Sequence, residues 1–336
     1  MKVIIQIPCF NEEKTLPQTL AELPREIPGV DSVEVLVIDD GSRDRTAEVA
    51  REHGVDHLVR HTHNRGLASA FRSGIEACLA LGADVIVNTD ADNQYNAADI
   101  PRLVEPLLRR EADIVIGDRQ TQTVAHFSWL KKRLQWLGSF VVRRLAGLDD
   151  VPDAVSGFRA LTRSAARQIN ILSAFSYTIE MVIQAGKKGL AVRSVPIAVN
   201  PMTRDSRLYS TVFEFIQRSA TTLLRVYAMY QPLRILVLVG ALLMLAGALP
   251  IFRFLYVFFR DDGAGHVQSL VLGGVLISMG FMAFLVGLVA DLIAFNRQLL
   301  ERLLERVRRL EEIGQRGGDA GVEPAGSSSA DPTSEG

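Results

Sequence analysis

The sequence predicts an α/β layered domain with a mainly parallel sheet, followed by a hairpin of two transmembrane helices. Short apolar runs alternate with amphipathic helical patterns from residue 1 to about residue 200. Two long apolar runs follow. Of the 336 residues, 48% are hydrophobic, which is a high share for a purely soluble protein. Part of the chain is therefore expected to lie in lipid.

Apolar runs of strand length recur through the first 200 residues. They are Val3 to Ile7, Val33 to Ile38, Val85 to Asn88, Ile114 to Ile116 and Val192 to Ile197, and a short strand is also expected at Leu58 to Arg60. Strands that alternate with helices form parallel sheets, whose ligands gather at the carboxyl ends of the strands. The chain enters the first strand without the basic start of a signal peptide, so this domain should stay on the side where it is synthesised.

Two apolar runs are long enough to cross a membrane, Ile235 to Phe252 and Val267 to Ala290. Two buried helices of a soluble domain are the alternative, but both runs are too long and too uniformly apolar for it. The connecting segment Arg260 to His266 holds one basic residue, whereas several arginines flank the hairpin on both sides. The positive-inside rule places both flanks, and with them the first domain and the C-terminus, in the cytoplasm.

These patterns divide the chain into consecutive parts. We expect a first domain over 1–211, a juxtamembrane amphipathic helix over 212–232, transmembrane helices over 233–260 and 267–293, a cytoplasmic helix over 294–313 and a disordered tail over 314–336. The amphipathic helix would lie either at the membrane interface or on the surface of the first domain. The tail is rich in Gly, Ser, Pro and acidic residues and has no apolar periodicity, which is typical of disorder.

Charge and cysteine content argue against two classes of function. The chain has 37 Lys and Arg against 38 Asp and Glu, so a general attraction to nucleic acid has no support. Cys9 and Cys78 lie far apart and form no CxxC pair, which disfavours a disulfide framework or a zinc site. Both cysteines are predicted to be small core residues.

The strongest chemical signal is Thr89-Asp90-Ala91-Asp92-Asn93-Gln94, directly after the strand that ends at Asn88. Two carboxylates one residue apart can hold a hard divalent cation, Mg²⁺ or Mn²⁺, which the oxygens of a diphosphate would share. Two aspartates in a loop can also serve solubility or a turn. Their position at a strand end favours the metal.

Two further motifs follow the first two strands, Ile7-Pro8-Cys9-Phe10-Asn11-Glu12-Glu13 and Val37-Ile38-Asp39-Asp40-Gly41-Ser42-Arg43-Asp44. In the first, Asn11 can cap the next helix, which is a structural explanation for the motif. In the second, the carboxylates can accept hydrogen bonds from a base or ribose. A tight turn is the alternative there.

With His63-Asn64-Arg65-Gly66-Leu67-Ala68 and Val155-Ser156-Gly157-Phe158-Arg159, these motifs resemble family 2 glycosyltransferases of the GT-A fold. More narrowly, the chain resembles polyprenyl-phosphate (dolichyl- or undecaprenyl-phosphate) hexose synthases, over roughly residues 1 to 210. The resemblance implies a Rossmann-like GT-A catalytic domain over 1–211. It also implies an enzyme that moves a hexose from a UDP- or GDP-sugar to a polyprenyl phosphate at the cytoplasmic membrane face.

The resemblance further implies roles for individual residues. The nucleotide-sugar would be bound by Pro8, Phe10, Asn11, Glu12, Asp39, Asp40, Asp90 and Ala91. Mg²⁺ or Mn²⁺ would be held by Asp90, Asp92 and Gln94. The lipid phosphate would be bound by Arg119, Arg133, Arg204, Ser206 and Arg207, and the catalytic residues would be Asp92, Arg119, Arg204 and Arg207. The segment Thr203 to Arg207 departs from some relatives by containing Asp205.

The charge of the acceptor determines the expected mechanism. A phosphomonoester is anionic at neutral pH, so it can attack the anomeric carbon without a strong base once cations screen the donor diphosphate. This predicts one in-line displacement with inversion. The expected partners are the nucleotide-sugar, polyprenyl phosphate and membrane lipids but no nucleic acid, and the resemblance adds a homo-oligomer.

The main alternative is a membrane-bound family 2 enzyme that glycosylates a hydroxyl of a lipid or glycan, for which Asp92 would act as a base. A processive polysaccharide synthase is disfavoured because no Gln-x-x-Arg-Trp element precedes the membrane region. A catalytically silent membrane anchor would be expected to lack the metal carboxylates, yet Asp90 and Asp92 are both present. No GxxxxGK[ST] motif supports a P-loop phosphotransferase.

Overall fold

The computed structural model describes residues 1–120, 139–140, 142–144, 146–148, 151–171, 177–200, 232–260 and 267–319. Several predictions lie outside these residues. They concern Arg133, Arg204, Ser206 and Arg207, the amphipathic helix up to residue 231, and the tail from residue 320.

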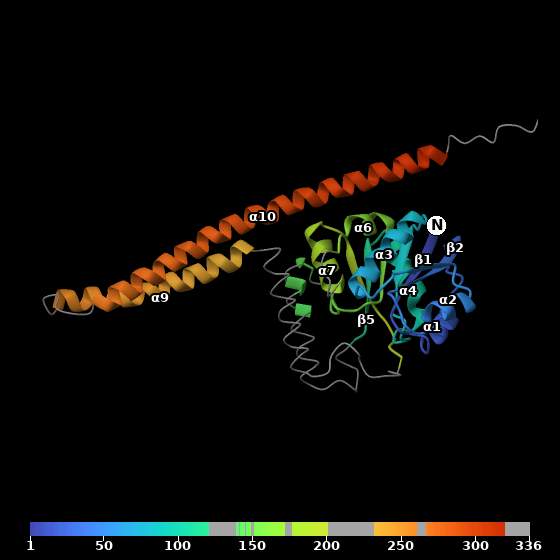
Figure 1. The fold of residues 1–336 in the computed structure, drawn as a ribbon, viewed down its shortest axis with the longest axis horizontal. Helices are drawn as coiled ribbons and strands as arrows, with labels where there is room; N and C mark the ends of the chain where they lie inside the picture. The colour runs from blue at the N-terminus through green and yellow to red at the C-terminus, as the bar shows by residue number, and fades with distance from the viewer. Residues whose placement is uncertain are drawn as a thin grey trace, which may run out of the picture. The chain divides into compact units, whose positions relative to one another are not determined.

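Within the described residues, a seven-stranded sheet forms the centre of the N-terminal domain, in the order β3-β2-β1-β4-β6-β5-β7 (Figure 1). The strands are β1 (Lys2–Cys9), β2 (Ser32–Asp39), β3 (His57–Arg60), β4 (Val85–Asn88), β5 (Ile114–Asp118), β6 (Arg159–Thr162) and β7 (Val192–Pro196). All neighbours pair in parallel except β6, which is antiparallel to β4 and to β5. The predicted α/β class with a mainly parallel sheet is confirmed.

The strand β6 was not among the expected strands. Its sequence, Arg-Ala-Leu-Thr, begins with a charged residue and contains no continuous apolar run. Nevertheless Arg159, Ala160 and Leu161 are all fully buried, because β4 and β5 flank the strand on its two sides. This segment is a strand because it pairs with β4 and β5, and no local sequence pattern predicts that pairing.

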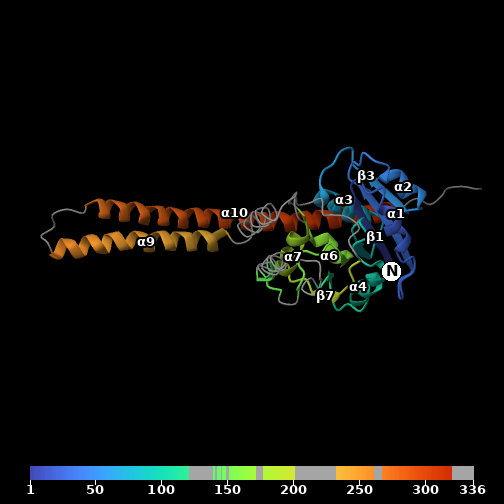
Figure 2. The same ribbon diagram turned by 90° about the horizontal axis from the view of Figure 1, so that it is seen from below.

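Helices cover both faces of the sheet (Figures 1 and 2). They are α1 (Leu16–Glu22), α2 (Thr46–Glu52), α3 (Leu67–Ala80), the 3₁₀ turn η1 (Ala97–Asp99), α4 (Ile100–Leu108), α6 (Arg163–Gln168) and α7 (Tyr177–Lys187). Apolar residues of α3, α6 and α7 pack with Ile4 and Ile86 on one face, and those of α1, α2 and α4 pack with Val3 and Val85 on the other. Successive strand residues point to opposite faces, so each strand contributes to two cores.

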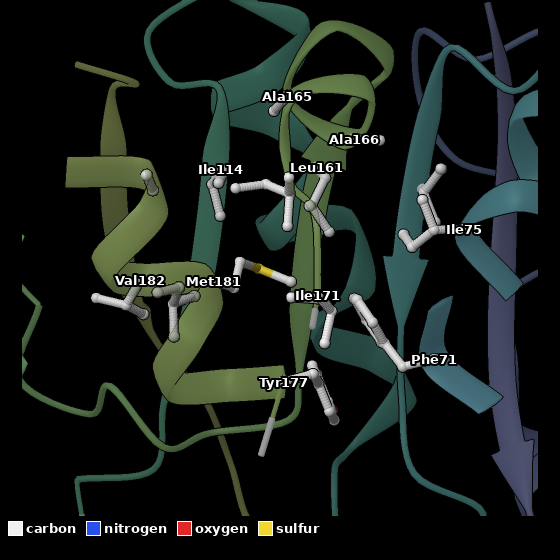
Figure 3. Packing of buried hydrophobic residues seen from close by; sticks show 14 of the residues in the cluster. Phe71, Ile75, Ile114, Leu161, Ala165, Ala166, Ile171, Tyr177, Met181 and Val182 are labelled. Atoms are coloured by element: carbon white, nitrogen blue, oxygen red, sulfur yellow. The ribbon is translucent and has the colours of Figure 1, made fainter. Parts of the chain in front are cut away.

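Figure 3 shows the first of these two cores, where Phe71 of α3 lies beside Tyr177 of α7, and Ile75 and Met181 belong to the same cluster. The rings of Phe71 and Tyr177 stack with their centroids 4.0 Å apart. Cys9 and Cys78 are both buried, in opposite cores, as predicted.

Two long helices follow, α9 (Pro232–Arg260) and α10 (Val267–Asp319), and α9 lies side by side with the first part of α10 in both views (Figures 1 and 2). The candidate spans are Pro232–Arg260, with a mean hydropathy of 2.7, and Val267–Asn296, with a mean hydropathy of 2.3. Only 11% and 17% of their most apolar stretches are buried. Helices in the core of a soluble domain would be mostly buried, so these helices fit a membrane instead.

Glycine brings the backbones of α9 and α10 together. A Cβ atom at Gly240 would lie 2.7 Å from the carbonyl oxygen of Gly280, and one at Gly247 would lie 2.8 Å from the carbonyl oxygen of Gly273. Close contact at small residues is how helices associate in lipid, where burial of apolar surface gives little driving force.

The helix α10 runs to Asp319, beyond residue 313, where the predicted cytoplasmic helix ends. Residues 314–319 are therefore helical, which corrects the predicted start of the tail. Gly314, Gly317 and Gly318 lie within this helix, although glycine is unfavourable in a helix interior.

Candidate active site

The predicted motifs gather at one edge of the sheet. The strands β2, β1 and β4 are parallel neighbours, so the residues that follow them emerge together. Since β6 is antiparallel to both β4 and β5, the end of β5 and the segment that leads into β6 meet this same edge. Asp39, Asn11, Asp90 and Arg119 all belong to it, in keeping with ligand sites at the carboxyl ends of parallel strands.

Hydrogen bonds join the loop after β1 to the loop after β2. The Asn11 N–H donates to Ser42 Oγ at 2.9 Å, and Asn11 Oδ1 accepts from the Arg43 N–H at 2.9 Å. The Glu12 N–H donates to Thr46 Oγ1 at 2.8 Å. The two loops therefore form one unit, which Pro8 and the exposed ring of Phe10 adjoin.

This geometry corrects the capping explanation for Asn11. The helix α1 begins at Leu16, and its N-cap residue is Thr15. Asn11 instead has a φ of 56°, in the left-handed region that asparagine tolerates better than most residues. Its side chain connects two loops and does not begin a helix.

The two aspartates at the end of β2 have different surroundings. Asp39 is fully buried, and its Oδ1 accepts from the Ser42 N–H at 2.9 Å. Arg60 Nε lies 3.0 Å from Asp39 Oδ2, but none of the described residues donates a well-directed hydrogen bond to this oxygen. Asp39 Oδ2 is thus a buried acceptor that a ligand can satisfy.

Asp40 is occupied by the protein itself. Its Oδ1 accepts from the Arg65 N–H at 2.9 Å and lies 2.7 Å from His61 Nδ1, and its Oδ2 accepts from the Gly66 N–H at 2.8 Å. These bonds hold the loop between β3 and α3. Asp40 thus supports this loop, and the nucleotide role implied for it stays a prediction.

Asp90 and Asp92 lie in the loop after β4. Burial raises the pKa of Asp90 above its ordinary value, and the negative charge of Asp92 raises it further, whereas Arg119 and a hydrogen bond from Tyr95 act in the opposite direction. Two close carboxylates in a partly buried site repel each other, and a bound cation would relieve this repulsion. The donor set is oxygen-only, which fits Mg²⁺ or Mn²⁺.

Among the described residues, no group of three or more His, Cys, Asp or Glu side chains could hold a metal alone. The pair at Asp90 and Asp92 would need further ligands from Gln94, water and a diphosphate. This is the expected composition of a Mg²⁺ site, where substrate phosphates complete the shell. The residues present therefore fit a cation that is shared with the substrate.

Neighbouring elements fix the path of this loop. Thr19 Oγ1 of α1 donates to the Ala91 carbonyl oxygen at 3.1 Å, and Asn93 Nδ2 donates to Glu22 Oε1 at 3.0 Å. The Asn200 N–H donates to the Gln94 carbonyl oxygen at 2.9 Å. The Ala91 backbone is thus held by protein contacts.

Arg119 follows β5 and is paired with a residue that the sequence did not single out. Its Nε and Nη2 bind Asp153 Oδ2 and Oδ1 at 2.7 and 3.0 Å, which is the bidentate geometry of a strong ion pair. Nη1 takes no part in this pair. Asp153 gave no local signal, because it lies in a loop 34 residues from Arg119.

Gly157 lies against the carboxylate of Asp90. A Cβ atom at this position would be 3.0 Å from Asp90 Oδ2 and 3.1 Å from the Tyr177 hydroxyl. The Gly157 N–H donates to the Tyr95 hydroxyl at 3.0 Å. Only a glycine lets the backbone approach the carboxylate this closely.

Arg159 is a structural residue of the same segment. It is fully buried, and its guanidinium donates to the carbonyl oxygens of Ala154, Ser156 and Thr178 at 2.7 to 2.8 Å. Burial lowers the pKa of Arg159 to about 10, so it stays charged at neutral pH. Arg159 thereby fixes the turn that presents Gly157.

A family model for glycosyl transferase family 2 matches residues 4–169. An undecaprenyl-phosphate mannosyltransferase from Micrococcus luteus is 32% identical over 207 residues, which cover 59% of this chain and 83% of that protein. A UDP-N-acetylglucosamine–dolichyl-phosphate N-acetylglucosaminyltransferase from Methanococcus voltae is 28% identical over 215 residues, which cover 58% of this chain and 84% of that protein.

Among solved structures, glucosyl-3-phosphoglycerate synthase from Mycobacterium tuberculosis, in complex with Mn²⁺, UDP and glucosyl-3-phosphoglycerate, matches with a TM-score of 0.51. The match covers 68% of this chain and 78% of that one, at 20% sequence identity. At this identity the likeness concerns the fold alone.

Proposed function

The chain belongs to glycosyl transferase family 2, and from this premise we propose that it moves a hexose from a UDP- or GDP-sugar to a polyprenyl phosphate, with inversion at the anomeric carbon. It is a glycosyltransferase with a GT-A-type domain and two candidate membrane spans. Two relatives named for undecaprenyl and dolichyl phosphate acceptors support the proposed acceptor.

The observation that carries the proposal is the convergence of three features at one sheet edge. The buried carboxylate oxygen Asp39 Oδ2 lies at the end of β2, the Asp90 and Asp92 carboxylates follow β4, and the Arg119 guanidinium follows β5. A nucleoside, a diphosphate and an acceptor phosphate need these three kinds of partner.

In the proposed reaction, an oxygen of the acceptor phosphate forms a bond to the anomeric carbon while the bond to the donor diphosphate breaks. Asp39 orients the nucleoside, and Arg119, held by Asp153, orients the acceptor phosphate through Nη1. Asp90, Asp92 and Gln94 would hold Mg²⁺ or Mn²⁺, which neutralises charge on the leaving diphosphate. No side chain has to remove a proton, because the attacking phosphate is already an anion.

We place the catalytic domain and the C-terminus in the cytoplasm, with α9 and α10 crossing the membrane. The arginines that flank the two apolar helices support this orientation. Externally added protease should leave the C-terminal tail intact in cells and remove it once the membrane is opened. If the protease removes the C-terminal tail from intact cells, the proposed orientation is wrong.

The proposal is tested by incubating the full-length protein in detergent with Mn²⁺ or Mg²⁺, undecaprenyl phosphate and a panel of UDP- and GDP-sugars. We expect one sugar to appear on the lipid, in a phosphodiester linkage of inverted configuration that mild acid cleaves. A parallel reaction with a lipid that ends in a hydroxyl provides the control. Transfer to the hydroxyl alone would refute the phosphate acceptor and favour the glycosylation of lipids or glycans.

A further inference from the structure

Two side-chain amides are buried in the apolar middle of β1 and at the end of β4. Gln6 of β1 and Asn88 of β4 are both fully buried and lie opposite each other in the sheet register. Their neighbours along the strands are Val and Ile. Because burying an amide is costly unless its hydrogen bonds are made, this pair calls for a physical reason.

The two amides form a network of hydrogen bonds that leads toward the candidate active site. Gln6 Nε2 donates to Asn88 Oδ1 at 3.0 Å. Asn88 Nδ2 in turn donates to the Gly157 carbonyl oxygen at 2.8 Å and to the Tyr177 hydroxyl at 3.1 Å. Gly74 of α3 leaves room for this arrangement, because any Cβ atom there would clash with Gln6 Oε1.

This hydrogen-bond network ends beside the carboxylate of Asp90, a predicted metal ligand. The peptide N–H of Gly157 is bound to the Tyr95 hydroxyl, and its carbonyl oxygen is bound to Asn88. The Asp90 oxygens lie so close to Gly157 that a Cβ atom there would be 3.0 Å from Oδ2 and 3.2 Å from Oδ1. Gly157 is therefore fixed on both sides while it forms one wall of the Asp90 site.

Two stacked aromatic pairs hold the hydroxyl groups of Tyr95 and Tyr177 in place. Tyr177 stacks on Phe71 with ring centroids 4.0 Å apart, and Tyr95 stacks on Phe158 with ring centroids 5.0 Å apart. Figure 3 shows the first of these pairs. Each hydroxyl thus belongs to a ring that cannot turn without losing its stacking contact. The stacking thereby fixes the Tyr95 hydroxyl, which accepts from the Gly157 N–H, and the Tyr177 hydroxyl, which accepts from Asn88 Nδ2.

We propose that Asn88 is a positioning residue that holds the Gly157 peptide against Asp90 and so fixes the carboxylate for metal binding. The inference rests on the metal assignment of the proposed function. Asn88 acts through Gly157 and touches neither metal nor substrate. Asp153 lies in the same loop as Gly157, four residues before it. The position of this loop therefore also affects the position of the Arg119 guanidinium, which Asp153 binds.

The test is Mn²⁺ binding to the full-length protein in detergent, measured by electron paramagnetic resonance with UDP and, separately, with GDP. Asn88→Leu removes the Nδ2 donor and the Oδ1 acceptor but fills a similar space. We expect the Mn²⁺ dissociation constant to rise by about 10-fold or more, as for other groups that orient a metal ligand without binding the metal. Tyr177→Phe, which keeps the stacking on Phe71, should raise it less.

Ile86→Ala is the matched control. Ile86 lies on β4 two residues before Asn88 and faces the same core. Its side chain is apolar and so cannot form a hydrogen bond with Gly157. We expect Ile86→Ala to lower the melting temperature without changing the Mn²⁺ dissociation constant. Equal weakening of Mn²⁺ binding by Ile86→Ala would show a general loss of stability and would overturn the positioning role.

The failure of this inference can be distinguished from the failure of the proposed function. If the unaltered protein binds Mn²⁺ and both Asn88→Leu and Tyr177→Phe bind it equally well, the positioning role is wrong and the metal assignment stands. If the unaltered protein binds no Mn²⁺ with either nucleotide, the metal assignment itself fails. If Asn88→Leu does not fold, the Mn²⁺ dissociation constant of Tyr177→Phe tests the positioning role instead.

Discussion

Adjacent residues of one type take different roles because their surroundings differ. Asp39 keeps a buried oxygen that none of the described side chains satisfies with a hydrogen bond, whereas both oxygens of Asp40 are bound by the loop between β3 and α3. A sequence pattern assigns the two aspartates to the same site. Only the hydrogen bonds distinguish a residue available to a ligand from one that supports the backbone.

Substitution by asparagine should separate these two roles. Asp40→Asn should destabilise the protein by about 1–3 kcal/mol, because a donor replaces an acceptor that bound N–H groups. Its melting temperature should fall measurably in a thermal unfolding scan. Asp39→Asn keeps an oxygen for the Ser42 N–H, so it should instead raise the KM for the sugar nucleotide. The reverse pattern would contradict the assignment.

Asp92→Ala should abolish turnover, because one carboxylate cannot hold a divalent cation against the donor diphosphate. We expect a loss of at least about 100-fold in kcat/KM, which corresponds to roughly 2.7 kcal/mol. The exposed Glu48→Ala on α2 serves as the control and should retain normal rates. Near-normal turnover of Asp92→Ala at limiting Mn²⁺ would show that the metal is bound elsewhere.

Sequence reasoning found the residues whose signal is local. Asp39, Asp90 and Asp92 directly follow apolar strands, and that position alone suggested a ligand site. Asp153 and Tyr177 were missed, because their contacts with Arg119 and Asn88 span 34 and 89 residues of sequence. Such contacts depend on which strands become neighbours, and no local pattern records that.

At the scale of elements, the strands and spans were predictable because their apolar periodicity is strong. The strand β6 was not, since its four residues become a strand only between β4 and β5. The packing of α9 on α10 was also not predictable from hydropathy, because the apolar residues look alike on all sides. Glycine marks the shared face, and this became evident only from its contacts.

Gly280→Leu should separate the two apolar helices, because a side chain there would collide with the Gly240 carbonyl oxygen and with Met244. The closely matched control is Gly274→Leu on the same helix, where a Cβ atom meets nothing within 4 Å. We expect the first change to lower the melting temperature in detergent and the second to leave it nearly unchanged. Similar effects of both changes would mean that the glycine contact does not hold the hairpin together.

At the scale of the whole molecule, the chain joins a layered α/β domain to two apolar helices. The composition already indicated this division, because the charged and apolar residues are distributed so unevenly along the chain. The family resemblance and the measured similarity to family 2 glycosyltransferases agree on the domain. The acceptor-side residues predicted at Arg133, Arg204, Ser206 and Arg207 lie outside the described residues and stay predictions.

Removal of residues 232–319 should release the protein from the membrane. The two candidate spans have mean hydropathies of 2.7 and 2.3, far above what a water-exposed helix tolerates. We expect the full-length chain to stay with the membrane pellet during an alkaline carbonate wash and the shortened chain to appear in the supernatant. Release of the full-length chain by carbonate would argue for a peripheral association.

Burial of Cys9 and Cys78 makes the protein resistant to thiol chemistry. The chain contains no other cysteine, and burial raises the pKa of both thiols, so little thiolate is available to alkylating or oxidising reagents. A single reporter cysteine introduced on the surface would therefore carry nearly all of the maleimide signal. Spectroscopic labels can be attached without first removing the native sulfhydryl groups.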